Sequence, residues 1–176
     1  MNAAIKKNGL NFGLIIGVIS IAATTIMYVT DLALFSKWWI GIIIFLIDMI
    51  LGIVAVGKAK AAMGGFISFK EAFTAFFIAM AIGAAIGSIY MFILFNFIDP
   101  GAKDVIMQSI KEMTVSTLQN AGMKSEDIRK QIQMMEESDN FGLWGQLKSY
   151  VFGLIFYIVI GLIVAAAMKK NRPEFE

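Results

Sequence analysis

The sequence predicts an all-α integral membrane protein with four transmembrane helices in two hairpins. An extracytoplasmic, amphipathic helical hairpin is predicted between the third and fourth helices. Each of four apolar stretches is close to the roughly 20 residues that a helix needs to cross a bilayer core. The chain is 59% hydrophobic and only 16% charged, whereas soluble domains are about a quarter charged. The only long polar stretch separates the third apolar stretch from the fourth. We therefore treat residues 1–176 as one membrane domain.

The first span is predicted at residues 9–30, because the chain carries no charge from Gly9 to Thr30. Lys6 and Lys7 precede this stretch and resemble the basic start of a secretory signal peptide. The apolar stretch is longer than the apolar region of a typical signal peptide, however. We therefore expect a span that is retained in the protein.

The second span is predicted at residues 38–56, after a short turn at residues 31–37. Trp38 and Trp39 open it, and tryptophans at the start of a span are typical of an anchor at the level of the lipid headgroups. The span contains a single acidic residue, Asp48, near its middle.

The third span is predicted at residues 69–98. Ser68 and Glu71 have the spacing of a capping box, in which each side chain bonds the backbone N–H of the other residue and fixes the start of a helix. Asp99 and Pro100 end the span, because the residue before a proline avoids helical backbone angles.

The polar segment, residues 99–146, predicts two amphipathic helices. The first covers about residues 102–119 and is followed by Gly122 as a helix C-terminal glycine. The second has Ser125 as its N-cap and ends near Ser138. Their apolar faces are formed by Ile106, Ile110 and Met113, and by Ile128, Ile132 and Met135. These faces fit either the outer headgroup layer or a cap on the bundle.

The fourth span is predicted at residues 148–168, and the basic residues then predict the orientation. Cytoplasmic loops of membrane proteins carry an excess of Lys and Arg. With four spans, both termini and the connector between the second and third spans lie on one side. That side holds Lys6, Lys7, Lys58, Lys60, Lys70, Lys169, Lys170 and Arg172. We therefore expect cytoplasmic termini and an extracytoplasmic segment 99–146.

Two spans carry small residues at four-residue spacing. The two stripes are Gly9, Gly13 and Gly17 in the first span, and Ala79, Gly83 and Gly87 in the third. Such stripes let helix backbones approach closely, and close packing drives helix association inside a membrane. The stripes are expected to pack within the bundle, where the two stripes could also pack against each other. The alternative is a surface for a second copy or for another subunit.

Asp48 is the strongest candidate for a functional residue, because an ionisable group in mid-membrane is costly. No Lys or Arg lies at mid-span to pair with it, so hydroxyl groups at similar depth are its expected partners. These are Ser20 or Thr24, Ser88 and Tyr157. Three interpretations remain open: a neutral, hydrogen-bonded carboxyl that locks the bundle, a proton or cation site, and a charge pair with a partner subunit.

The composition narrows the functional classes. The chain has no Cys and no His, which removes thiolate nucleophiles, the usual zinc ligands and the commonest general base. We therefore expect a protein that is not an enzyme, with no catalytic residue, metal or cofactor. The net charge of +2 is too small to indicate nucleic acid as a partner. The expected partners are the lipid bilayer and a second copy or another membrane protein.

Four stretches resemble a known family: NGLNFGLIIGVIS in the first span, GGFISFKEAF after the basic connector, FNFIDP at the end of the third span, and TLQNAGMKSEDIRKQIQMME in the polar segment. They resemble the DUF4199 family of small bacterial membrane proteins, a domain of unknown function, over nearly the whole chain. The resemblance implies a four-span protein in the inner membrane of a Gram-negative cell. It implies no activity or catalytic residue.

Two functions follow as expectations. The first is a non-enzymatic membrane subunit or scaffold that acts through its small-residue stripes and its polar helical segment. The second is a small transporter or channel that acts through Asp48.

Overall fold

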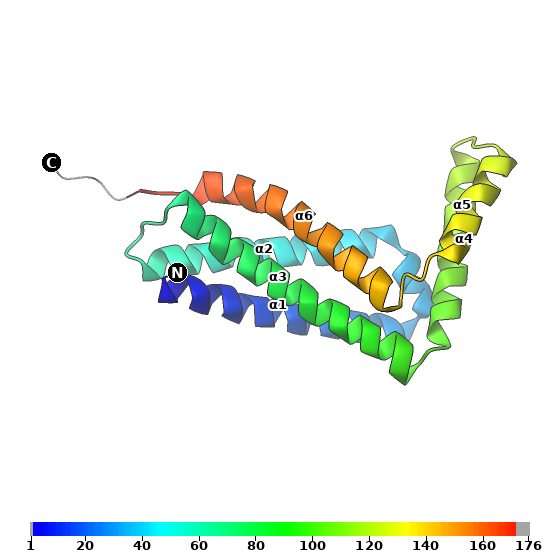
Figure 1. Ribbon diagram of the computed structural model, residues 1–176, viewed down its shortest axis with the longest axis horizontal. Helices are drawn as coiled ribbons and strands as arrows, with labels where there is room; N and C mark the ends of the chain where they lie inside the picture. The colour runs from blue at the N-terminus through cyan, green and yellow to red at the C-terminus, as the bar shows by residue number, and fades with distance from the viewer. Residues whose placement is uncertain (1, 172–176) are drawn as a thin grey trace.

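The computed structural model describes residues 2–171 and confirms the all-helical architecture. Four long helices lie side by side, and two shorter ones lie across one end of them (Figure 1). The long helices are α1 (Ala3–Thr30), α2 (Trp38–Ala62), α3 (Phe69–Ile93) and α6 (Leu143–Met168), and the short ones are α4 (Ala102–Asn120) and α5 (Ser125–Glu137). Each long helix is apolar and long enough to cross a membrane. The chain is a multi-pass membrane protein.

The long helices extend beyond the predicted spans. The first begins at Ala3 rather than residue 9, and the side chain of Asn2 caps it by accepting from the N–H of Ala4 (2.9 Å). The second continues to Ala62 rather than residue 56, and the fourth begins at Leu143 rather than residue 148. Hydropathy marks the part of a helix that lies in the membrane core. Ala and Lys are good helix formers, so the helix itself continues past the core.

The connector between α2 and α3 is therefore short. Gly64 (φ +78°) ends α2, and its N–H donates to the carbonyl of Ala61 while that of Gly65 donates to Lys60. The capping box of Ser68 and Glu71 is confirmed at the start of α3.

The connector also holds the end of α6. The backbones of Ile67 and Lys170 exchange two hydrogen bonds (2.9 and 2.8 Å), and Lys60 Nζ donates to the carbonyl of Met168 (2.9 Å). Arg172, which contributed to the predicted orientation, lies outside the described residues.

Helix α3 is the centre of the bundle and contacts α1, α2 and α6. Its closest approach is to α1, where the two small-residue stripes meet. A Cβ atom on Gly13 would lie 2.8 Å from Cβ of Ile82, and one on Gly17 would lie 2.6 Å from Cδ1 of Ile86. A Cβ atom on Gly83 would collide with Ile16. The stripes are therefore occupied by the α1–α3 contact inside this chain.

Helix α4 covers the end of the bundle that lies opposite the start of α1 and the end of α6 (Figure 1). A π-helix, η2 (Leu94–Ile98), continues α3, and a 3₁₀ helix, η1 (Leu32–Ser36), joins α1 to α2. The side chains of Ala102 and Ile106 on α4 are buried against Phe95 of η2, together with Phe35 of η1. The first half of α4 is therefore a cap on the bundle.

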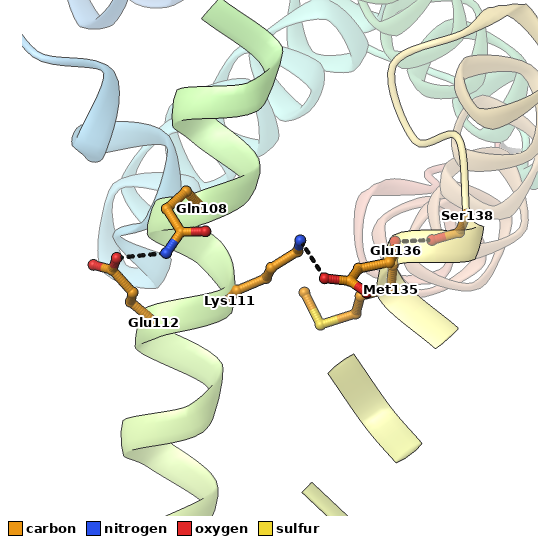
Figure 2. Close-up of polar contacts among 6 residues, drawn as sticks. All are labelled: Gln108, Lys111, Glu112, Met135, Glu136 and Ser138. Atoms are coloured by element: carbon orange, nitrogen blue, oxygen red, sulfur yellow. Dashed lines mark hydrogen bonds and ion pairs between the residues drawn. The ribbon is translucent and has the colours of Figure 1, made fainter. Parts of the chain in front are cut away.

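Helix α5 folds back along α4 rather than onto the long helices. Ile128 is buried at this contact, and Lys111 Nζ of α4 lies 2.7 Å from Oε1 of Glu136 (Figure 2). Gly122 (φ +76°) makes the predicted turn after α4. The predicted N-cap is wrong by one residue: Ser125 is the first residue of α5, and Lys124 occupies the N-cap position without a side-chain hydrogen bond.

Candidate functional site

The candidate polar residues surround one cavity of about 500 Å³ between the long helices and α4. They come from all four long helices: α1 contributes two hydroxyls, α2 the carboxyl, and α3 and α6 one hydroxyl each. They are Ser20, Thr24, Asp48, Ser88 and Tyr157. Four aromatic rings, those of Phe35, Phe141, Tyr150 and Tyr157, line the same cavity.

Asp48 is the only ionisable carboxyl among the residues that line this cavity, and no Lys or Arg is among them. The residue is 8% exposed. Its Oδ1 atom is buried and has no hydrogen-bond partner within residues 2–171. The hydroxyl groups expected as partners line the cavity but do not donate to this oxygen. One acceptor of the Asp48 carboxyl is therefore buried and unsatisfied beside the cavity.

The bundle is closely packed one helical turn beyond Asp48. A Cβ atom on Gly52 would lie 2.7 Å from the ring of Phe76, and Phe76 and Met80 are fully buried. Ala55 and Val56 continue this packed core toward the end of the bundle where α1 begins and α6 ends. Asp48 therefore lies at the closed end of the cavity.

The other end of the cavity lies under α4 and the residues that lead into α6. Asn140 and Ser149 line it and are exposed, so the cavity reaches the molecular surface here. Asn96, in the π-helix, fixes this region because its Nδ2 donates to the carbonyls of Phe92 (2.9 Å) and Phe141 (2.7 Å). π-Helical turns are frequent at functional sites, and here the turn places the Asn96 amide beside the mouth of the cavity.

The first turns of α6 supply lining residues that were not among the predicted site residues, and one of them, Gln146, precedes the predicted span. They are Gln146, Ser149, Tyr150 and Gly153. The phenolic hydroxyl of Tyr150 donates to the carbonyl of Ala81 on α3 (3.1 Å). A pattern in the sequence could have identified these residues. Together with Tyr157, they follow one another at intervals of three or four residues, which places them on one face of a helix.

The donor set limits the ligand chemistry. Within residues 2–171, no three His, Cys, Asp or Glu side chains gather into a possible metal site. The cavity instead offers one carboxyl, several hydroxyls and four aromatic rings. A carboxylate pairs with a single positive charge, and aromatic faces attract organic ammonium ions. The arrangement therefore suits an organic ammonium ion.

No curated protein and no solved structure matches the chain. The DUF4199 family, described as a protein of unknown function, matches residues 11–170. This match covers all four membrane helices from Asn11 onward, the α4–α5 hairpin and every residue of the cavity. The chain therefore belongs to the DUF4199 family, as its resemblance implied.

Proposed function

We propose that this protein is a membrane transporter that binds a small organic ammonium ion at Asp48. One observation carries the proposal: Asp48, a mostly buried carboxyl with one unsatisfied oxygen, is the only Asp, Glu, Lys or Arg among the residues that line a 500 Å³ cavity. Buried polar groups are nearly always satisfied, so an exception needs a reason. An ionisable group within a membrane span is a functional-site candidate by default. A cationic ligand in the cavity would neutralise the charge of the Asp48 carboxylate.

The cavity volume favours an organic ion over a bare metal ion or a proton. Pockets for organic ligands measure about 300–1,000 Å³, and this cavity of about 500 Å³ lies within that range. Ser20, Thr24 and Ser88 supply hydroxyl oxygens that can accept from N–H groups, and the aromatic residues Tyr150 and Tyr157 line the same cavity.

Transport requires a second conformation. The packed core at Gly52, Phe76 and Met80 separates Asp48 from the other end of the bundle. Release on that side requires α2 to move away from α3, as in alternating access. The structure would then correspond to the state that is accessible from the α4 side.

The alternative is a non-enzymatic subunit or scaffold. The small-residue stripes support this alternative less than the sequence indicated, because both stripes are occupied by contacts within the chain. The polar helical segment still supports it, because α5 lies at one end of the molecule (Figure 1) and most of its residues are exposed. Catalysis is expected in neither case, because the chain has no His or Cys to serve as base or nucleophile.

The direct test is uptake of radiolabelled tetramethylammonium by liposomes that contain the purified protein. This probe carries a permanent charge and cannot cross the lipid as a neutral amine. We expect saturable uptake above that of protein-free liposomes. Uptake equal to that of protein-free liposomes, combined with no binding of the probe to the purified protein, would exclude the proposal.

We further propose that both termini are cytoplasmic, that α4 and α5 lie outside, and that the protein resides in a bacterial inner membrane. The basic residues at the terminal end, Lys58, Lys60 and Lys70 among them, support this orientation. Because the chain contains no Cys, the labelling of single introduced cysteines can show which side of the membrane each position faces. In intact cells, a membrane-impermeant maleimide should label Ser125→Cys and leave Ala61→Cys unlabelled until the cells are lysed. The reverse labelling pattern would show that the termini are extracytoplasmic, opposite to this proposal.

A further inference from the structure

A second, apolar groove lies beside the cavity on the surface between α3 and α6. It measures about 230 Å³. Five apolar residues line it: Ala85, Ile89 and Phe92 from α3, and Leu143 and Leu147 from α6. Ile89 is 59% exposed and Leu143 is 65% exposed. Ile89 and Phe92 lie within the predicted third span, whereas Leu143 and Leu147 precede the predicted fourth span, so we place the groove at the lipid boundary near the α4 end of these helices.

The groove and the cavity share part of their walls. Ser88, Gln146 and Tyr150 line both of them. Tyr150 is held between the two spaces by its hydrogen bond to the carbonyl of Ala81 (3.1 Å). The α3–α6 contact therefore carries a polar junction, with the Asp48 cavity on one side and a lipid-facing apolar groove on the other.

We infer that the ligand of Asp48 is a single-chain amphiphile, an ammonium group that carries an alkyl chain. This inference rests on the proposed function and names its substrate class. The ammonium group occupies the cavity and pairs with Asp48, while the chain passes Tyr150 and lies in the groove. The ligand then reaches the cavity laterally from the bilayer, between α3 and α6. The groove supplies apolar contact, and the single carboxyl supplies the charge complement.

The test uses dodecyltrimethylammonium with a diazirine in the chain, bound to the protein in phospholipid nanodiscs. After illumination, mass spectrometry locates the labelled residues. We expect enriched labelling of Ile89, Phe92 and Leu147, reduced at least fivefold in Asp48→Asn. The same chain with an alcohol in place of the ammonium group reports labelling by simple partition into lipid, and it should not depend on Asp48.

A matched pair of variants tests the groove itself. Ala85→Phe fills the groove from α3, whereas Ala22→Phe adds the same ring to an exposed position on α1. We expect Ala85→Phe to weaken binding of the long-chain probe at least fivefold and to leave tetramethylammonium binding unchanged. Ala22→Phe should change neither.

The outcomes separate this inference from the proposed function. If tetramethylammonium binds in an Asp48-dependent manner but the long-chain probe shows no Asp48-dependent labelling of the groove, the proposed function stands and the amphiphile is excluded. If neither probe binds, both proposals fail. If groove labelling is the same in wild type and Asp48→Asn, the groove holds bulk lipid only, and the inference is overturned.

Discussion

Asp48→Asn is expected to abolish measurable binding of tetramethylammonium. The substitution keeps the shape of the side chain and removes the only charge that lines the cavity. Removing one partner of a buried charge pair costs about 2–5 kcal/mol, which corresponds to a loss of affinity of roughly 30-fold or more. The measurement is binding to the purified protein in nanodiscs, followed by uptake into liposomes. Asp104→Asn, at an exposed position in the first turn of α4, is the control and should leave both unchanged.

The stability of Asp48→Asn distinguishes a binding residue from a structural one. A carboxyl that locks the bundle would lower the free energy of unfolding when it is replaced. In the structure, Oδ1 has no partner to lose among the described residues. Asn keeps a polar side chain at this position but removes the buried charge, so we expect the free energy of unfolding to stay the same or to rise. Unchanged binding, or a clear loss of stability, would identify Asp48 as a structural residue.

The sequence predicts the helices of this protein well because their signals are local. Hydropathy identifies the spans, and the capping residues Ser68 and Gly122 mark real helix ends. The helices extend beyond the predicted spans at ends where the backbone stays helical. Lys58 and Lys60 lie beyond the predicted second span, and α2 continues through both of them. Lysine is unfavourable in lipid, but it is a good helix former.

The position of α4 could not be predicted from its own sequence. An amphipathic face with Ile106 and Ile110 suits a lipid surface as well as a protein surface. The choice depends on whether apolar side chains from distant segments meet it. Here Phe35 and Phe95 do so, and their rings pack edge to face with centroids 5.5 Å apart.

The polar residues of the site were predictable by depth, but the cavity was not. Ser20, Thr24, Ser88 and Tyr157 lie at depths similar to Asp48 in a four-span protein, so their gathering follows from the helix register. The volume between them depends on how far α2 and α6 diverge. That distance is set by tertiary contacts such as the one between Phe45 and Phe156, whose ring centroids are 5.7 Å apart.

Gly83→Ala is expected to lower the free energy of unfolding by about 1–3 kcal/mol, as overpacking of a closed interface does. The added Cβ meets the branched carbons of Ile16 and approaches the carbonyl oxygen of Gly13 at 3.4 Å. Neither is the free end of a flexible side chain, so α1 and α3 must separate. Reversible unfolding in mixed micelles of mild detergent and dodecyl sulfate, followed by circular dichroism, measures the change.

Gly41→Ala separates the packing effect from the helix propensity of alanine. Gly41 lies in α2, and an added Cβ has no atom within 4 Å of it among the described residues. Alanine is the better helix former by up to about 1 kcal/mol, so Gly41→Ala should be neutral or stabilising. Adding Ile16→Ala to Gly83→Ala should recover stability relative to the sum of the single changes, because the two side chains compete for one space. If Gly83→Ala and Gly41→Ala have equal effects, α1 and α3 are not in close contact at Gly83, and the stripes are free for another chain.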